Sequence, residues 1–278
     1  MASYFNYKIL EFSVEISEGK FISLLETVAS IEYIENILSP VVYVSLVLLN
    51  TSGIISNLKL RGGEKVRLHI SQPATGKKIL FDETSKVFYI SRIGGSSTQS
   101  TKELLSMELV PRELLTNETA RVFRRYDSTI DKTVVKILTE ELDTKRFSSS
   151  TIDSTVNSYS FMGNARKPFT VLTWLLPKGI PQTSSGSSGT EKGTAGYLFY
   201  ENKNGYNYKS VDFLFSPDRQ PAEKYFYSET VLTPADSRIN FKMITTPIFS
   251  KNVNVIDNLT VGMYCSMNYF LDFNARKF

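Results

Sequence analysis

Apolar and polar residues alternate with a period of two through much of the first 110 residues, and this pattern predicts β-strands. Val14 and Ile16, for example, alternate with Ser13 and Glu15. Val41–Leu49 differs, because it is β-branched and apolar almost throughout, and it predicts a strand buried on both faces. Together these patterns predict five strands: Lys8–Ile16, Val41–Leu49, Lys65–Ile70, Ile79–Ile93 and Lys102–Val110, with a Gly94–Thr101 loop before the last. The N-terminal part is therefore expected to be a β-domain.

Beyond Pro111 the apolar spacing changes to that of short amphipathic helices. Residues 113–126 predict one helix, and a second follows from Ile130 to about Asp143. Ser128 and Asp131 have the spacing of a capping box for that second helix. Pro168 is suited to the first turn of a third helix, whose buried stripe would be Phe169, Leu172, Thr173 and Leu176.

The last third of the chain returns to strand patterns. Residues 182–195 are rich in Ser, Thr and Gly and predict a flexible loop. Asn204–Gly205 is a strong β-hairpin signal, with Tyr197, Phe199 and Glu201 on one face of the preceding strand. Residues 224–249 and 259–273 predict further strands. The chain is thus expected to be α+β and β-dominated, with a small helical insertion.

Composition and charge narrow the function classes. The 278 residues carry a net charge of +4, which is too weak to indicate nucleic-acid binding by itself. A single cysteine, Cys265, and a single histidine, His69, exclude an intrachain disulfide and a zinc site built from Cys or His. The N-terminus lacks the pattern of a secretory signal, and no apolar run reaches the length of a membrane span. We expect no cofactor, no metal and no membrane insertion.

Candidate chemical groups each have a simpler structural interpretation. His69 lies on the polar face of a predicted strand, and Cys265 lies in an apolar segment typical of a buried thiol. Gly62–Gly63–Glu64 lacks the lysine and hydroxyl residue of a phosphate loop and predicts a turn. Acidic pairs such as Glu140–Glu141 leave a carboxylate hydrolase open as a third hypothesis. We expect that the chain is not an enzyme.

Aromatic and basic residues indicate interfaces instead. The chain has 15 Tyr and 18 Phe against one Trp, concentrated on predicted strands, and such strands suit large protein–protein interfaces. Three arginines are expected to share one helical face as a salt-bridge surface rather than a nucleic-acid site. The candidate interface residues are Gly62, Gly63, Glu64, Arg121, Arg124, Arg125, Tyr197, Phe199, Tyr200 and Tyr206.

Several segments resemble the central baseplate hub protein of contractile-tailed, T4-like bacteriophages. The resemblance extends over most of residues 5–215 and is most specific at its C-terminal end. It rests on these segments: Phe5–Ile70 with VVYVSLVLLNTSGIISNL, Lys86–Arg92, Glu103–Val110, the helix pair Asn117–Leu142, Phe169–Pro181 with Trp174, Ala195–Asn202 and Gly205–Asp212.

The resemblance implies a structural virion protein located in the tail baseplate and assembled in the host cytoplasm. It implies a homotrimer that connects a sixfold tail tube, or a tube initiator, to a threefold central spike and contacts other baseplate proteins. DNA would pass through its lumen. Residues 1–111 would form a tail-tube-like β-barrel domain, and 112–205 a helix-containing insertion domain. Residues 206–278 would complete the barrel or form a second tube-like domain.

A second hypothesis stays open beside the hub. A receptor- or carbohydrate-binding β-protein of a virion surface would use exposed aromatic residues, such as Tyr206 and Tyr208, to stack on sugars. A closed ring with an axial hole favours the hub, whereas a solid trimer with outward pockets favours the sugar-binding protein.

Overall fold

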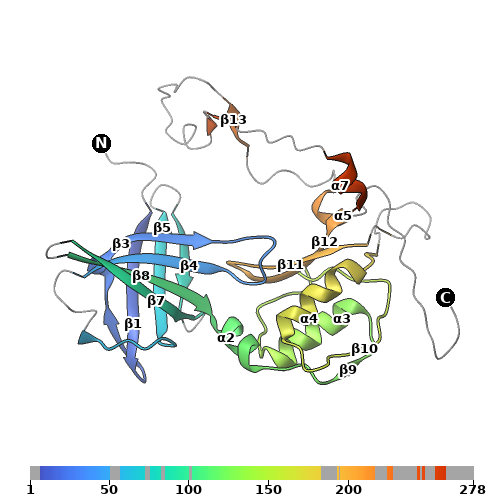
Figure 1. Ribbon diagram of the computed structural model, residues 1–278, viewed down its shortest axis with the longest axis horizontal. Coiled ribbons are helices and arrows are strands. Elements are labelled where there is room, and N and C mark those ends of the chain that lie inside the picture. The colour runs from blue at the N-terminus through green and yellow to red at the C-terminus, as the bar shows by residue number, and fades with distance from the viewer. Residues whose placement is uncertain are drawn as a thin grey trace, which may run out of the picture. The chain divides into compact units, whose positions relative to one another are not determined.

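The computed structural model describes residues 7–50, 57–72, 76–82, 85–99, 102–182, 193, 195–216, 224–227, 243–244, 246–247 and 254–260. The chain divides into two compact units, Met1–Pro221 and Ala222–Phe278. The first unit contains a large antiparallel sheet followed by a helical part and a β-hairpin (Figure 1). Among the described residues, no helix is both long and apolar enough to cross a membrane.

One eight-stranded sheet makes up the N-terminal part of the first unit. Its strands are β1 (Lys8–Ser17), β2 (Lys20–Ser23), β3 (Val28–Ile34), β4 (Tyr43–Asn50), β5 (Lys65–Gln72), β6 (Lys77–Phe81), β7 (Phe88–Gln99) and β8 (Lys102–Pro111), with the short 3₁₀ helix η1 (Leu25–Thr27) before β3. The order is β2-β1-β5-β7-β8-β4-β3, and β6 pairs with β5. No ladder joins β2 to β3 in the part of the chain that the structure describes, so a closed barrel stays a prediction.

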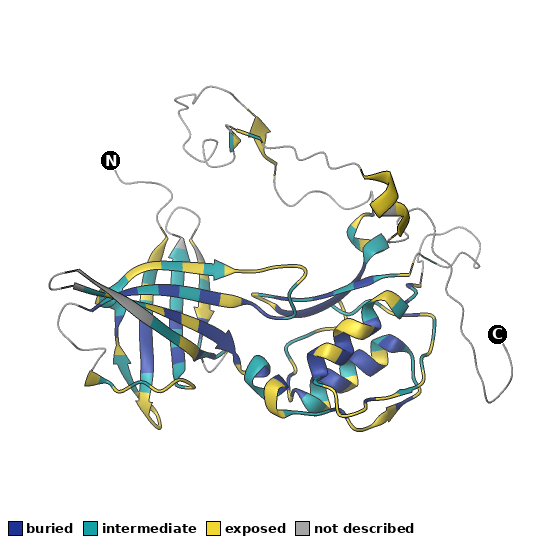
Figure 2. Ribbon diagram, in the orientation of Figure 1, coloured by how far each residue is buried: buried dark blue, intermediate teal, exposed yellow. Residues whose placement is uncertain are grey.

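The sheet curls around one core, as Figure 2 shows by its buried inner positions. Aliphatic residues from β1, β4, β5, β7 and β8 meet there, together with Phe12, Phe81 and Phe88. The strands at Lys8–Ile16, Lys65–Ile70 and Lys102–Val110 are confirmed. The two-sided burial predicted for Val41–Leu49 is wrong, because only alternate residues of β4 are fully buried. Its other face lies on the outside of the curled sheet.

The region from Ile79 to Gln99 also differs from its prediction. Ile79–Ile93 is not one strand, because the chain turns after Phe81 and separates β6 from β7. Much of the predicted Gly94–Thr101 loop is strand, since β7 continues to Gln99 and pairs with β8 across two register shifts. Gly94 permits this close pairing, because a Cβ there would lie 2.1 Å from the Ser106 hydroxyl oxygen.

The helical part contains the following elements: α2 (Arg112–Thr119), β9 (Arg125–Tyr126), α3 (Ile130–Lys136), the π-helical turn η2 (Ile137–Glu141), β10 (Phe161–Met162), α4 (Pro168–Leu175) and the 3₁₀ turn η3 (Leu176–Lys178). The helices predicted after Thr129 and at Pro168 are confirmed. The buried stripe predicted for the latter is partly wrong, because Thr173 is exposed and Leu175 is buried in its place. The first prediction is too long, because α2 ends at Thr119. The capping box is absent from this end: Thr129 is the N-cap of α3, and Asp131 N–H donates to Thr155 Oγ1 at 3.1 Å.

A hairpin of β11 (Tyr197–Asn202) and β12 (Gly205–Ser210) packs against the helices, and the short helix α5 (Val211–Leu214) follows it. The hairpin is confirmed at Asn204–Gly205, where Gly205 has a φ of +127°. It crosses residue 205, where the sequence places a domain boundary. Together the hairpin and helices enclose a second core, rich in aromatic residues.

The second unit is described in three short elements. These are β13 (Phe226–Tyr227), which pairs in parallel with β14 (Met243–Ile244), and the helix α7 (Val255–Thr260). Of the other positions predicted as strand at 224–249 and 259–273, the structure describes 224–225 and 246–247, which are not in a strand, and Leu259 and Thr260, which are helical. The remaining positions lie outside the described residues. Most of the 182–195 loop and Cys265 also lie outside them.

Candidate functional site

The three residues Gly62, Gly63 and Glu64 form a turn that attaches the start of β5 to β7. The Glu64 carboxylate accepts the backbone N–H groups of Arg61 and Gly62 at 2.7 and 2.9 Å. Gly63 N–H donates to Ile90 O at 2.7 Å, and Ile90 N–H donates to Glu64 O at 3.0 Å. The sequence prediction of a turn before a strand agrees with this arrangement. Its role in an interface between subunits stays a prediction.

The three arginines do not share a helix face. Arg121 lies beyond the end of α2 and donates to the carbonyls of Glu118 and Ala120, at 2.9 and 2.6 Å. Arg124 pairs with Glu140, and Arg125 in β9 lies 3.5 Å from Asp127. The expected single stripe is therefore wrong, because the helix ends before these residues. Each arginine side chain therefore contacts a carbonyl or carboxylate group of the same chain.

The aromatic residues of the hairpin face the interior of the chain. Tyr197, Phe199 and Tyr206 are between 0 and 3% exposed, whereas Tyr200 is half-buried. Tyr206 stacks on Phe199 with ring centroids 5.6 Å apart. Since the chain's own core covers these three rings, they are not available as a surface for another subunit in this fold.

Four charged side chains meet where the sheet joins the helical part. The Glu201 Oε1 of β11 lies 2.7 Å from Lys86 Nζ, just before β7, and 2.7 Å from Arg146 Nη1. The second oxygen of Glu201 accepts the backbone N–H of Val42 at 3.0 Å. Arg146 also lies 3.5 Å from Glu113, whose carboxylate accepts the Thr144 hydroxyl at 2.8 Å. We call Lys86, Glu113, Arg146 and Glu201 the ionic junction.

Burial makes this junction energetically important. The side chains of Lys86 and Glu201 are 3% and 0% exposed. Burial lowers the pKa of Lys86 to about 8, although the neighbouring Glu201 carboxylate opposes the shift. The ammonium also lies 4.8 Å from the centre of the Phe88 ring, and cation–π attraction there favours the charged form. Two cations balance two carboxylates, so the junction as a whole is neutral.

The hairpin turn is held beside the junction by backbone contacts. Tyr206 N–H donates to Arg146 O at 2.7 Å, and Lys203 N–H donates to Glu35 Oε1 at 2.6 Å. A Cβ at Gly205 would lie 2.1 Å from Arg146 O, so only glycine fits. The hairpin therefore contacts both the sheet and the segment that carries Arg146.

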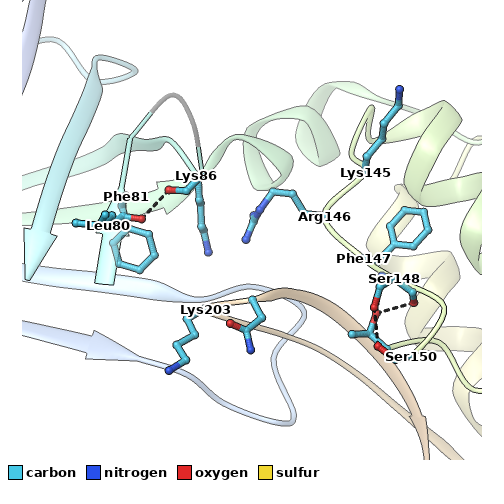
Figure 3. A pocket seen from close by; sticks show the side chains of 12 residues that line it. Leu80, Phe81, Lys86, Lys145, Arg146, Phe147, Ser148, Ser150 and Lys203 are labelled. Carbon is cyan, nitrogen blue, oxygen red and sulfur yellow. Dashed lines mark hydrogen bonds between the residues drawn. The ribbon is translucent and has the colours of Figure 1, made fainter. Parts of the chain in front are cut away.

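A cavity of about 510 Å³ lies beside the junction and is lined by four cationic side chains and several hydroxyls. Figure 3 shows the ends of Lys86 and Arg146 pointing toward each other, whereas Lys145 and Lys203 point away. The two cations that face inward are already neutralised by Glu201 together with Glu113. Lys86 and Arg146 therefore have no net charge left to hold an anion. The geometry favours a structural role, in which these residues join the sheet to the helical part.

No carboxylate partner for His69 is identifiable from the sequence, but the structure provides two. His69 Nδ1 lies 3.1 Å from Glu11 on β1, and Nε2 lies 3.2 Å from Asp82, which follows β6. The three side chains are 19 to 34% exposed and lie on the outer face of the curled sheet. Among the described residues, no group of three or more His, Cys, Asp or Glu is arranged to hold a metal ion.

Comparison with known proteins gives a likeness of fold. No protein-family model matches the chain, and no curated protein does. Among solved structures, the 43 kDa tail protein of prophage MuSo2 from Shewanella oneidensis superposes with a TM-score of 0.50 at 9% identity. The match covers 80% of this chain and 57% of that protein. The two chains therefore share a fold.

Two further solved structures are similar over a comparable length. A tail protein from Neisseria meningitidis has a TM-score of 0.45 at 12% identity, covering 84% of this chain and 57% of its own. An Escherichia coli component of the type VI secretion system, described as similar to T4 bacteriophage tail proteins, has a TM-score of 0.44 at 14% identity, covering 80% and 52%. This chain thus spans between half and two thirds of each protein's length.

Proposed function

We propose that this chain is a structural component of a phage-type tail, located in the baseplate as a hub. The observation that carries the proposal is the shared fold with the Shewanella prophage tail protein over 80% of this chain. The resemblance of the sequence segments to the central baseplate hub supports the same assignment. A fold alone does not define a function, so the ionic junction supplies a second, physical support.

The ionic junction favours a mechanical role over a chemical one. Glu201 joins Lys86, which precedes β7, to Arg146 of the helical part, and it also accepts the N–H of Val42. Because a buried ion pair holds only in a narrow geometry, the sheet and the helical part are fixed relative to each other. A hub under load from a contracting tail requires such rigidity.

In the proposed assembly three copies form a ring that joins the sixfold tail tube to the threefold spike. The curled sheet would supply a tail-tube-like domain, with its barrel completed by other parts of the chain or by a neighbouring copy. Interfaces with the tube, the spike and other baseplate proteins replace catalysis, and DNA passes through the lumen.

The mass and shape of the purified full-length chain test the proposal. Light scattering after size exclusion should give three times 31.4 kDa, and class averages in the electron microscope should show rings with an axial hole. Addition of a candidate spike protein should give a larger complex with a single spike per ring. A monomer at all concentrations, or a solid trimer that binds glycans, would contradict the hub.

A further inference from the structure

A groove lies along the exposed face of α4, away from the ionic junction. Its first hollow, of about 280 Å³, is lined by Phe161, Met162, Val171 and Trp174, with Arg166 among the lining residues. A second, shallow hollow over the outer face of α4 shares Thr170 and Trp174 with the first. We call these two hollows the Trp174 groove. Both open to solvent beside helix α4, whose exposed positions are visible in Figure 2.

Trp174 is held in place while much of it stays accessible. Its indole packs nearly perpendicular to the rings of Tyr159 and Phe161, at centroid distances of 5.5 and 5.3 Å. Lys178 Nζ lies 4.5 Å from the centre of its ring. Trp174 is nevertheless 44% exposed, and Met162 is 58% exposed. A fixed and exposed Trp loses little entropy when a partner binds, and Trp and Arg are common in binding hot spots.

Arg166 is presented to the groove by a tight turn. Arg166 N–H donates to Gly163 O at 3.1 Å, and Asn164 and Ala165 between them have φ values of +50° and +56°. A left-handed conformation is costly for alanine. Gly163 cannot be replaced, since a Cβ would lie 2.4 Å from Val122 O. Within the described part of the chain, the Arg166 guanidinium makes no ion pair, and no carboxylate lines the groove.

We propose that the Trp174 groove binds a protein segment that inserts a bulky apolar side chain and places a carboxylate on Arg166. The apolar lining matches the side chain, and the single free guanidinium matches one carboxylate by charge complementarity. The proposal goes beyond the hub function, because it concerns this surface whatever the oligomeric state.

Nucleic acid and carbohydrate fit the groove less well. A nucleic-acid strand needs several free cations to follow its phosphates, but the nearby Lys167, Arg124 and Arg125 pair with Glu118, Glu140 and Asp127. A sugar ring needs an open aromatic face, and Lys178 covers one face of Trp174. An acidic protein segment needs only the apolar lining and the Arg166 guanidinium, both of which the groove provides.

Trp174 itself reports binding, because it is the sole tryptophan of the chain. The full-length protein is titrated with acetyl-Gly-Asp-Phe-Asp-Gly-amide and with the matched peptide that has Asn for both Asp. The acidic peptide should produce a saturable change in Trp174 emission at concentrations up to about 5 mM, whereas the Asn peptide should bind about fivefold more weakly.

Two variants and one control assign the effect to the groove. Arg166→Gln should remove the difference between the peptides, and Thr170→Glu should weaken the acidic peptide more than the neutral one. Arg124→Gln, a surface arginine paired with Glu140, should leave the difference unchanged. Equal binding of both peptides, no saturable change, or a difference that survives Arg166→Gln would overturn the proposal. Saturable binding of oligothymidylate or a chitin trisaccharide in place of the peptide would also overturn it.

Discussion

The two cores of the first unit are both largely aliphatic but differ in their buried tyrosines, which occur in the core between helices and hairpin and not among the buried residues of the sheet core. The curled sheet encloses mainly Val, Leu and Ile, contributed by alternate positions of its strands. The core between helices and hairpin contains stacked aromatic rings, among them Tyr197 on Tyr208, with centroids 4.3 Å apart. The first core thus needs only burial and shape, whereas the second must also accommodate polar atoms.

Because of that difference, we expect the stability of the molecule to be most sensitive to substitutions in and beside the second core. The hydroxyls of Tyr206 and Tyr208 are buried and have no hydrogen-bond partner among the described residues. The ionic junction lies next to them and depends on one carboxylate, Glu201. Loss of a single charge should therefore cost more here than a change of similar size in the aliphatic core, where a comparable loss requires removal of several carbon atoms.

The largest effect should come from Glu201→Gln. The change leaves buried Lys86 without its counter-charge, and we expect a loss of about 3–5 kcal/mol in the free energy of unfolding. Asp143→Asn is the matched control, because it breaks the exposed Arg112–Asp143 pair, and it should cost less than about 1 kcal/mol. Urea denaturation measures both. Equal costs for the two variants would show that the junction is not a strong joint.

Removal of carbon atoms from the aliphatic core tests the other side of the comparison. Leu46→Ala should cost about 2–4 kcal/mol, since Leu46 is fully buried in β4 and leaves a cavity. Leu104→Ala in β8 is the control, because that side chain is 38% exposed, and it should cost about 1 kcal/mol or less. A Leu46→Ala cost as small as that of the control, in the same urea experiment, would mean that the sheet core is loosely packed.

The pH dependence of the free energy of unfolding should report the titration of the buried Lys86. Burial lowers the pKa of Lys86 to about 8 in the folded chain, against 10.5 when it is unfolded. Between these values the unfolded chain binds more protons at Lys86, so this residue should contribute a rise of about 2 kcal/mol in stability from pH 8 to 10, seen as the difference from a variant without the lysine.

Lys86→Met should remove that rise, and stability of both proteins should fall above pH 10. The fall follows because burial raises the pKa of tyrosines such as Tyr126, to about 12, so the unfolded chain loses those protons first. Urea midpoints at a series of pH values provide the measurement. A stability difference between the unmodified chain and Lys86→Met that stays constant from pH 8 to 10 would contradict the predicted charge state of Lys86.

The smallest effect is expected for two tyrosines of the aromatic core, which differ in whether the hydroxyl is hydrogen-bonded. Tyr206→Phe removes a buried hydroxyl that has no partner in the described structure, and it should stabilise the chain by up to about 1 kcal/mol. Tyr197→Phe should instead destabilise it by about 1 kcal/mol, since Tyr197 donates to Ser154 O at 2.7 Å. Melting temperatures should shift in opposite directions. Shifts in the same direction would remove the distinction.

Local patterns predicted much of the secondary structure. Alternation located β1, β5 and β8, Pro168 located the start of α4, and Asn204–Gly205 located the hairpin turn. Local patterns did not predict the weaker interruptions. The sequence between the end of β6 at Phe81 and the start of β7 at Phe88 contains no glycine or proline, and α2 ends at Thr119 without either residue. In both places tertiary packing, rather than the local sequence, sets the boundary.

The candidate sites were much harder to predict. The ionic junction joins residues from four separate segments, and Glu201 lies 159 residues from Val42 in sequence. One signal did exist, because alternation placed Glu201 on the same face as Tyr197 and Phe199, and a carboxylate on a buried face requires a partner. The Trp174 groove gave no comparable signal, since the exposure of Trp174 depends on how β10 and α4 pack.

The glycine at the hairpin turn limits how this protein can be modified. Turns between two strands are commonly chosen for insertion of an epitope tag. Here the turn is hydrogen-bonded at both of its ends, and Gly205 has no room for a side chain. An insertion between Lys203 and Tyr206 would push Arg146 away from Glu201. Labels for tracking this protein therefore belong elsewhere on the chain.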